Sequence, residues 1–198
     1  MFNGLSSEQG NDMSGSLVQV FAAIDGANAQ DPRVDEGQPE ALLYGQRMSQ
    51  QCARLFPDAS ETLQIAARGQ HVERWILKRA DYPEGKAGYL KWRRDLADHH
   101  AERVGGFMQA AGFSEADVEE TQKMLRKQGI KRDPQVQALE DVICFTFLTW
   151  YFAPFAAKHP AEKVLDIVQK TARKMSDAAR ARVLDEFDLP EDLAAAFS

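Results

Sequence analysis

Residues 87–111 read AGYLKWRRDLADHHAERVGGFMQAA, and this stretch decides the fold. Side chains that would line one face of a helix recur along it at spacings of three and four residues, and we call this line of side chains the seam. The seam consists of Tyr89, Arg93, Leu96, His100, Val104, Phe107 and Ala111. Such spacing places side chains on one face of an α-helix, because the helix turns once every ~3.6 residues. The stretch therefore predicts a long amphipathic helix with a histidine on its apolar face.

The same periodicity extends outward over most of the chain. Apolar stripes, capping residues and prolines predict helices at about 17–24, 39–55, 60–79, 114–129 and 134–153, with two or three shorter ones after Pro160. Residues 33–38 read as a polar loop, and no Val/Ile/Thr-rich alternating segment indicates a strand. We therefore expect an all-α, single-domain bundle of seven or eight helices over residues 14–198, preceded by a disordered leader at residues 1–13.

Composition narrows the class of partner. The 198-residue chain carries 24 Lys and Arg against 30 Asp and Glu, a net charge of −6. That balance argues against non-specific binding of nucleic acid, whose phosphates need a basic surface. Between Arg68 and Arg103, however, nine basic residues outnumber six acidic ones. This locally basic segment predicts a small anionic partner, although a solvated helix face explains the same excess.

Two cysteines, Cys52 and Cys144, are too few for a disulfide framework or a cysteine-based zinc site. We expect both to be buried free thiols. No basic segment followed by an apolar run opens the chain, and no stretch approaches the length of a membrane span. The sequence therefore predicts a cytoplasmic protein with no membrane partner.

Four polar residues lie in otherwise apolar helical stretches: His71, His100, Glu140 and Asp141. Helical phase selects His100 over His99, because His99 shares its face with charged residues. Glu140 and Asp141 fall on two different faces, and both faces are apolar. Burying an imidazole or a carboxylate without a partner is costly, so these groups must either pair within the core or hold a ligand between them.

If the four groups converge, they resemble a metal site inside a helical bundle. Neutral imidazoles and carboxylates suit Fe, Mn, Ni, Co or Zn better than Ca or Mg. His71, His100 and Asp141 are then the predicted ligands of a divalent transition metal, and Glu140 is a further ligand or the catalytic general base. The contacts predicted for an anionic substrate are Arg68, Gln70, Arg74 and Arg93.

Two simpler interpretations stay open. The polar residues can form a buried network without metal, with Asp141 paired to Arg68 or Arg74. Between and around the histidines, four aromatic residues stand among arginines: Trp75, Tyr82, Tyr89 and Trp92. These rings form either a pocket wall or helix–helix contacts, and their helical spacing favours the contacts.

The order and spacing of the candidates resemble the HD-domain pattern. His71 precedes His100 by 29 residues, and Asp141 follows 41 residues later. In that family a histidine, a His-Asp doublet and a later aspartate bind metal in all-α phosphohydrolases, and a small branch consists of di-iron oxygenases. Ala101 stands here where the doublet has its aspartate. The resemblance therefore implies an HD-like bundle with a mononuclear site held by His71, His100 and Asp141.

A second resemblance covers about residues 16–180. It is carried by Ile24-Asp25 with Asn28 and Asp31-Pro32, by Gln70-His71 with Arg74-Trp75, by Tyr82-Pro83, by Gly88-Tyr89 with Trp92-Arg93, and by Leu139-Glu140-Asp141. These motifs are similar to those of an uncharacterised family, domain of unknown function 4202. That family has no established activity, so the resemblance implies no substrate.

Three hypotheses for function follow. The first is a metal-dependent hydrolase of a small phosphorylated or otherwise anionic compound, of a divergent HD type. The second is a non-haem iron oxygenase of the HD type. The third, from a different class, is a metal-free binding or interaction module in which the same residues form a buried polar network.

Overall fold

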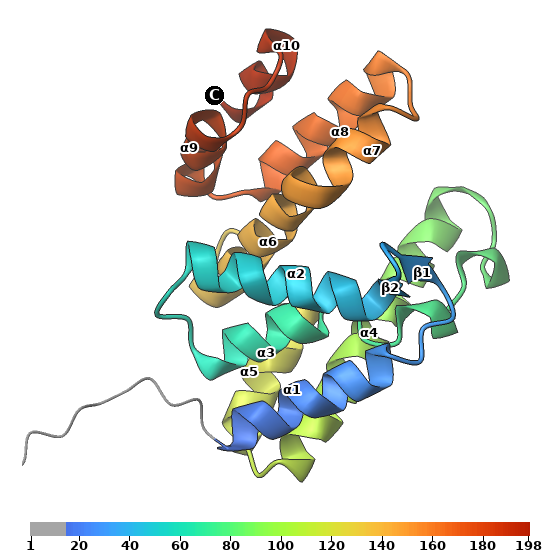
Figure 1. The fold of residues 1–198 in the computed structure, drawn as a ribbon, viewed down its shortest axis with the longest axis vertical. Helices are drawn as coiled ribbons and strands as arrows, with labels where there is room; N and C mark the ends of the chain where they lie inside the picture. The colour runs from blue at the N-terminus through green and yellow to red at the C-terminus, as the bar shows by residue number, and fades with distance from the viewer. Residues whose placement is uncertain (1–14) are drawn as a thin grey trace, which may run out of the picture.

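A computed structural model describes residues 15–198, so the predicted leader at residues 1–13 lies outside the described residues. The described part is an all-α, single-domain bundle, as predicted (Figure 1). Its helices are α1 (Gly15–Asn28), α2 (Glu40–Leu55), α3 (Glu61–Gly69), α4 (Gly85–Ala110), α5 (Glu115–Leu125), α6 (Pro134–Thr146), α7 (Phe152–Ala156), α8 (Ala161–Lys174), α9 (Asp177–Glu186) and α10 (Glu191–Ala194). Over residues 15–198, eight of these helices have nine or more residues, and α7 and α10 are shorter.

Short polar side chains start several of the helices. The hydroxyl of Ser60 accepts a hydrogen bond from the backbone N–H of Leu63 at the start of α3. Ser114 and Ser176 cap α5 and α9 in the same way. Each cap satisfies a backbone donor that the first helical turn leaves free, which explains why the sequence marks these boundaries well.

A small hairpin replaces the loop predicted at residues 33–38. Strand β1 (Val34–Asp35) pairs antiparallel with β2 (Gln38–Pro39). The turn between them places Glu36 at φ 48° and Gly37 at φ 78°, as a tight two-residue hairpin turn requires. Pro39 therefore ends a strand and precedes α2, whereas the sequence had placed it inside the helix. The pairing is only two residues long, too short to leave an alternating pattern in the sequence.

The helix predicted at 60–79 ends early, at Gly69, and this correction shapes the candidate site. Gly69 packs so closely on α4 that a Cβ there would lie 2.5 Å from the side chain of Val104. Four residues later, Glu73 adopts a left-handed φ of 51°, which a continuing α-helix excludes. Two short 3-10 turns follow, at Arg74–Ile76 and Arg79–Asp81. His71 and Arg74 consequently lie on a tight turn.

The helix predicted at 134–153 is continuous in direction but changes its winding. After α6, residues Phe147–Tyr151 form a π-helical segment that leads directly into α7. Single π-turns of this kind are rare and often lie beside functional sites. The segment brings Phe147 and Tyr151 to the same cavity wall as residues of α6.

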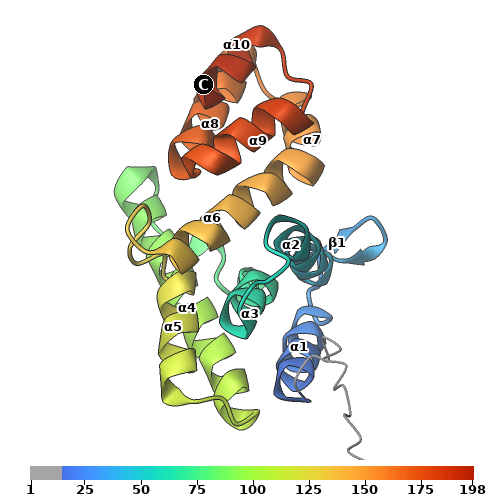
Figure 2. The ribbon, with the colours of Figure 1, turned by 90° about the vertical axis from the view of Figure 1, so that its left-hand side faces the viewer.

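Two groups of buried apolar side chains hold the bundle together. The first joins α1–α5 and the start of α6, and the second joins the end of α6 with α8–α10. Helix α6 contributes to both and runs from one group of helices to the other, as Figure 2 shows. Cys52 and Cys144 are buried free thiols, as predicted. Within residues 15–198, every helix is either too short or too polar to cross a bilayer.

Candidate functional site

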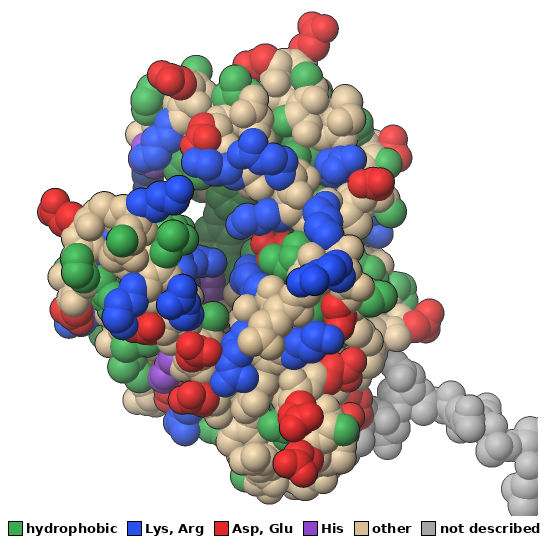
Figure 3. All heavy atoms as spheres, turned by 180° about the vertical axis from the view of Figure 1, so that it is seen from behind, with side chains coloured by type: hydrophobic (Ala, Val, Ile, Leu, Met, Phe, Trp, Pro, Cys, Tyr) green, Lys and Arg blue, Asp and Glu red, His purple; other side chains and the backbone are tan. Residues whose placement is uncertain are grey.

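A cationic pocket opens on the face of the molecule shown in Figure 3, where Lys and Arg side chains surround a hollow. The pocket has two arms, with volumes of about 530 Å³ and 420 Å³. Cavities of this size commonly hold small molecules. The arms share one wall, and we call it the shared wall. It consists of Gln70, Arg74, Arg93 and Lys127.

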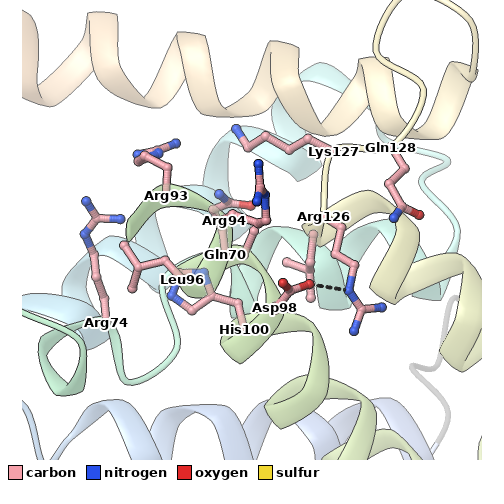
Figure 4. Close-up of a pocket in the computed structure, with 12 residues that line it drawn as sticks. Gln70, Arg74, Arg93, Arg94, Leu96, Asp98, His100, Arg126, Lys127 and Gln128 are labelled. Atoms are coloured by element: carbon pink, nitrogen blue, oxygen red, sulfur yellow. Dashed lines mark hydrogen bonds and ion pairs between the residues drawn. The ribbon is translucent and has the colours of Figure 1, made fainter. Parts of the chain in front are cut away.

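Three arginines at the pocket lack an acidic partner. Arg74, Arg93 and Arg94 form no ion pair with any carboxylate in residues 15–198. The guanidinium of Arg74 lies 5.0 Å from the centre of the Trp92 ring. Burial, followed by the charge of Arg93, lowers the pKa of Arg74 below its ordinary value. In Figure 4, Arg93 and Lys127 reach into the same space, whereas Arg126 turns away to Asp98.

Both predicted histidines face this region. His100 is only 3% exposed and lines the first arm, while His71 lines the second, and their ring centres lie 6.0 Å apart. Burial, followed by the positive charge of Arg74, holds the pKa of each imidazole well below its ordinary value. Both rings are therefore neutral at pH 7. His99 forms no part of the pocket lining and lies 3.6 Å from the carboxylate of Glu73.

The proton on His71 can be placed from its neighbours. Nε2 of His71 lies 3.4 Å from Nη1 of Arg74. A guanidinium only donates hydrogen bonds, so Nε2 must be the acceptor and the proton resides on Nδ1. The ring also stacks on Tyr44, with centres 3.8 Å apart and planes 16° from parallel. His71 is thus fixed by contacts on its face and at Nε2.

Glu140 is the one predicted acid that reaches the pocket. Its carboxylate is 2% exposed, accepts a hydrogen bond from Nζ of Lys127 at 2.7 Å and lies 3.6 Å from Nζ of Lys174. Burial alone would raise the pKa of Glu140. The charge and hydrogen bond of Lys127, with the charge of Lys174, outweigh this and bring the pKa below its ordinary value. Glu140 is therefore an ionised partner of the two lysines.

Asp141 and Arg68 lie outside the pocket lining, contrary to the predicted grouping. Asp141 accepts hydrogen bonds from the N–H of Ser176 at 2.8 Å and from its hydroxyl at 2.7 Å. Arg68 pairs with Asp25, with 2.7 Å between Nε and Oδ1. The simpler interpretation paired Asp141 with Arg68 or Arg74, and Asp141 pairs with neither. The remaining predicted substrate contacts, Gln70, Arg74 and Arg93, meet at the shared wall.

The residues of the pocket do not fit a metal centre well. Among residues 15–198, no three His, Cys, Asp or Glu side chains lie together in a way that could hold a metal ion. Asp141 is engaged elsewhere, and the unpaired arginines beside His71 and His100 disfavour a cation electrostatically. The predicted transition metal therefore stays an untested prediction.

Sequence reasoning missed several residues of the pocket, namely Tyr44, Lys127, Tyr151 and Lys174. Lys127 has a left-handed φ of 57° just after α5, at a position that no periodicity marks. Lys174 ends α8, where a basic residue is ordinarily explained by the helix dipole. The excess of basic residues between 68 and 103 pointed to this region but not to these four residues, which lie outside that segment.

The fold and the pocket define a small helical bundle with an open cationic pocket. Comparison with protein families places the chain: it belongs to the family described as Domain of unknown function (DUF4202), whose model matches residues 18–196. This confirms the closer of the two resemblances, whereas the HD-domain resemblance stays unconfirmed. No curated protein and no solved structure matches the chain.

Proposed function

We propose that the cationic pocket binds a small, multiply anionic compound, most plainly a phosphorylated one. A single observation carries the proposal: Arg74, Arg93 and Arg94 converge on one cavity without an acidic partner in the described chain. The protein as a whole is acidic, with a net charge of −6. A local excess of positive charge that no carboxylate pairs with favours an anion, which would balance it.

The chemistry of the shared wall supports a phosphate rather than a simple halide. Arginine presents a planar fork of N–H donors that matches the oxygens of a phosphate or carboxylate, and Lys127 adds a point charge. Arg74 and Arg93 repel one another, since the charge of Arg93 contributes to the lowered pKa of Arg74. A dianion between them would reverse this repulsion.

Glu140 prepares the pocket for such a ligand. It holds Lys127 in place and keeps Lys174 near the opening, at 2.7 Å and 3.6 Å. Because Lys174 is the looser and more exposed partner, it is free to turn toward a bound anion. Glu140 thus acts as a positioning residue for the two lysines in this proposal.

Calorimetric titration with inorganic pyrophosphate tests the proposal. We expect binding that weakens as salt is added, because the contacts are electrostatic. Arg93→Gln should lower the affinity by about tenfold or more, since a hydrogen bond to a charged group contributes roughly 1.5–3 kcal/mol. Arg103→Gln is the matched control, because Arg103 lies on the same helix but pairs with Glu73 outside the pocket. Absence of binding, or an equal loss in both variants, would contradict the proposal.

The hydrolase and oxygenase hypotheses need one further finding, a bound metal. Metal analysis of protein purified without a histidine tag, before and after incubation with Mn, Fe, Ni or Zn, provides it. Stoichiometric metal that is lost in His71→Ala and His100→Ala would support the enzyme hypotheses. Failure to take up metal would leave anion binding as the function, in agreement with the third hypothesis.

A further inference from the structure

The two arms of the pocket differ in chemistry. The first arm continues from the shared wall past Arg94, Arg126 and Gln128, with Leu96 and Leu125 among them. It has the greater positive charge and no Phe, Tyr or Trp side chain in its lining. The second arm continues past aromatic and aliphatic side chains. These are Tyr44, Ile143, Phe147, Tyr151 and Ile167. A ligand that was only a phosphate would use the shared wall and leave this second arm empty.

Beyond the shared wall, the charged residues of the second arm already have partners. Glu40 lies 3.4 Å from Arg33, and Glu140 holds Lys127 and Lys174. What remains for a ligand in this arm is mainly half-buried apolar surface. Covering such surface is favourable in proportion to its area, so the arm suits an uncharged, flat group.

Contacts within the chain hold the aromatic wall in place. Tyr44 stacks on His71, and the centre of the Tyr151 ring lies 5.9 Å from that of Tyr44. The hydroxyl of Tyr151 accepts a hydrogen bond from Nη1 of Arg47 at 3.2 Å. Thr149, in the same π-helical segment, accepts a hydrogen bond from Gln51 at 3.1 Å. A preformed wall costs a ligand little ordering entropy.

Three buried polar atoms of the pocket lining have no hydrogen bond within the described chain. They are the side-chain oxygen of Gln70, Nε2 of His100 and Oε1 of Glu140, and Oε1 of Glu140 has the charge of Lys174 3.6 Å away. Gln70 is 5% exposed and belongs to the shared wall, so both arms meet at this residue. Buried polar atoms normally have partners, and the empty acceptor on Gln70 calls for a donor such as a hydroxyl or amino group.

From these observations we propose that the ligand is an organic phosphate with an aromatic ring, of the nucleoside monophosphate class. Its phosphate lies against Arg74 and Arg93, its ring lies in the second arm beside Phe147 and Tyr151, and a hydroxyl or amino group between them donates to Gln70. This inference rests on the proposed anion binding and specifies the compound that fills the rest of the pocket.

Three probes separate the parts of this proposal in calorimetric titrations of the full chain. Inorganic phosphate tests the shared wall, ribose 5-phosphate adds hydroxyl donors, and adenosine 5′-monophosphate adds the ring. We expect adenosine 5′-monophosphate to bind about tenfold more tightly than ribose 5-phosphate, since stacking of a base on aromatic side chains contributes roughly 1–3 kcal/mol.

A pair of variants tests whether the second arm causes the tighter binding of adenosine 5′-monophosphate. Phe147→Leu keeps an apolar side chain but removes the aromatic face, so it should reduce the preference for adenosine 5′-monophosphate several-fold and leave ribose 5-phosphate unchanged. Phe155→Leu is the control, because Phe155 packs against Phe147 but lies outside the pocket lining. Thermal unfolding of both variants checks that they fold equally well.

The outcomes distinguish the two proposals. Equal affinity for adenosine 5′-monophosphate and ribose 5-phosphate would overturn the aromatic ligand and leave anion binding intact. An equal effect of Phe147→Leu and Phe155→Leu would overturn the placement of the ring. If none of the three probes binds, both proposals fail together.

Discussion

Glu140 and Asp141 are neighbours on α6, yet they belong to two different regions of the molecule. Both are buried, with exposures of 2% and 4%. Glu140 faces the cationic pocket and two lysines, whereas Asp141 faces the junction of α8 and α9, where Ser176 starts the next helix. Successive residues of a helix point about 100° apart, so two adjacent side chains lie in different surroundings.

The two regions differ in how completely their polar atoms are satisfied. The carboxylate of Asp141 accepts hydrogen bonds from the backbone and hydroxyl of Ser176 and from Gln137 at 3.0 Å. In the pocket, by contrast, Gln70 and His100 keep unpartnered atoms within the described chain. Complete satisfaction is typical of a residue that stabilises the fold. Open hydrogen-bonding capacity beside excess positive charge is typical of a binding site.

The largest expected effect that separates the two regions is on stability. Asp141→Ala removes the acceptor for the N–H and hydroxyl of Ser176, and we expect the free energy of unfolding to fall by about 2–4 kcal/mol. Urea denaturation measures this loss. Pyrophosphate affinity of the folded variant should equal that of the wild type, because Asp141 lies outside the pocket.

The milder variant Ser176→Ala serves as the control for this comparison. It removes one hydroxyl and leaves the backbone N–H of residue 176 bonded to Asp141, so it should cost about 1 kcal/mol. Full stability of Asp141→Ala, or a loss of ligand binding in that folded variant, would show that the two faces of α6 are not separate.

The next largest expected effect is the dependence of stability on pH, which reports on the two histidines of the pocket. The pKa values of His71 and His100 lie well below 6.5 in the folded protein, so the unfolded chain binds more protons as the pH falls. Stability is therefore complete above pH ~6.5. Below that, it falls by about 1.4 kcal/mol per pH unit for each histidine, until the folded pKa is reached. Glu140 adds its own loss only at lower pH, because its pKa lies below 4.5.

Denaturation at about pH 7.5 and pH 5 tests this expectation, since the unfolded pKa of histidine lies between them. His100→Gln removes one of the two titrating groups, so the difference in stability between the two pH values should shrink. His159→Gln is the control, because His159 belongs to neither arm of the pocket. If the stability difference between the two pH values is the same in His100→Gln as in the wild type, His100 does not cause the pH dependence.

The smallest effect is expected at the rim of the pocket. Lys174 is half exposed and only 3.6 Å from Glu140, so Lys174→Gln should weaken pyrophosphate binding by about two- to fivefold, as exposed ion pairs contribute roughly 0.2–1 kcal/mol. The loss should disappear at high salt. Lys170→Gln, on the same helix but paired with Asp166, should leave the affinity unchanged. A tenfold or larger loss in Lys174→Gln would move this lysine from the rim to the centre of the site.

Much of the fold could be predicted because helical periodicity and capping are local. The seam around His100 placed that imidazole in the interior, and the helical phase of residues 134–153 separated Glu140 from Asp141. The errors arose where tertiary contacts override a local pattern. The apolar spacing of the helix predicted at 60–79 continues beyond Gly69, but α3 ends there and Glu73 adopts a left-handed conformation that an α-helix excludes.

The candidate site was predicted in part, for a related reason. Gln70, Arg74 and Arg93 were identified and do meet, together with both histidines and Glu140. Lys127 and Lys174 were not identified, because each comes from a helix end whose direction depends on loops. Asp141 was grouped with the histidines because its burial was predicted correctly while its partner was not.

The sequence by itself determined an all-α chain, the burial of His100, the different faces of Glu140 and Asp141, and a basic segment in an acidic protein. These properties follow from the helical repeat and from composition. Only the tertiary structure decided that Asp141 meets Ser176, 35 residues away, and that Arg74, Arg93 and Lys127 share one wall. Burial creates the need for a partner, but the packing of helices across loops decides which partner satisfies it.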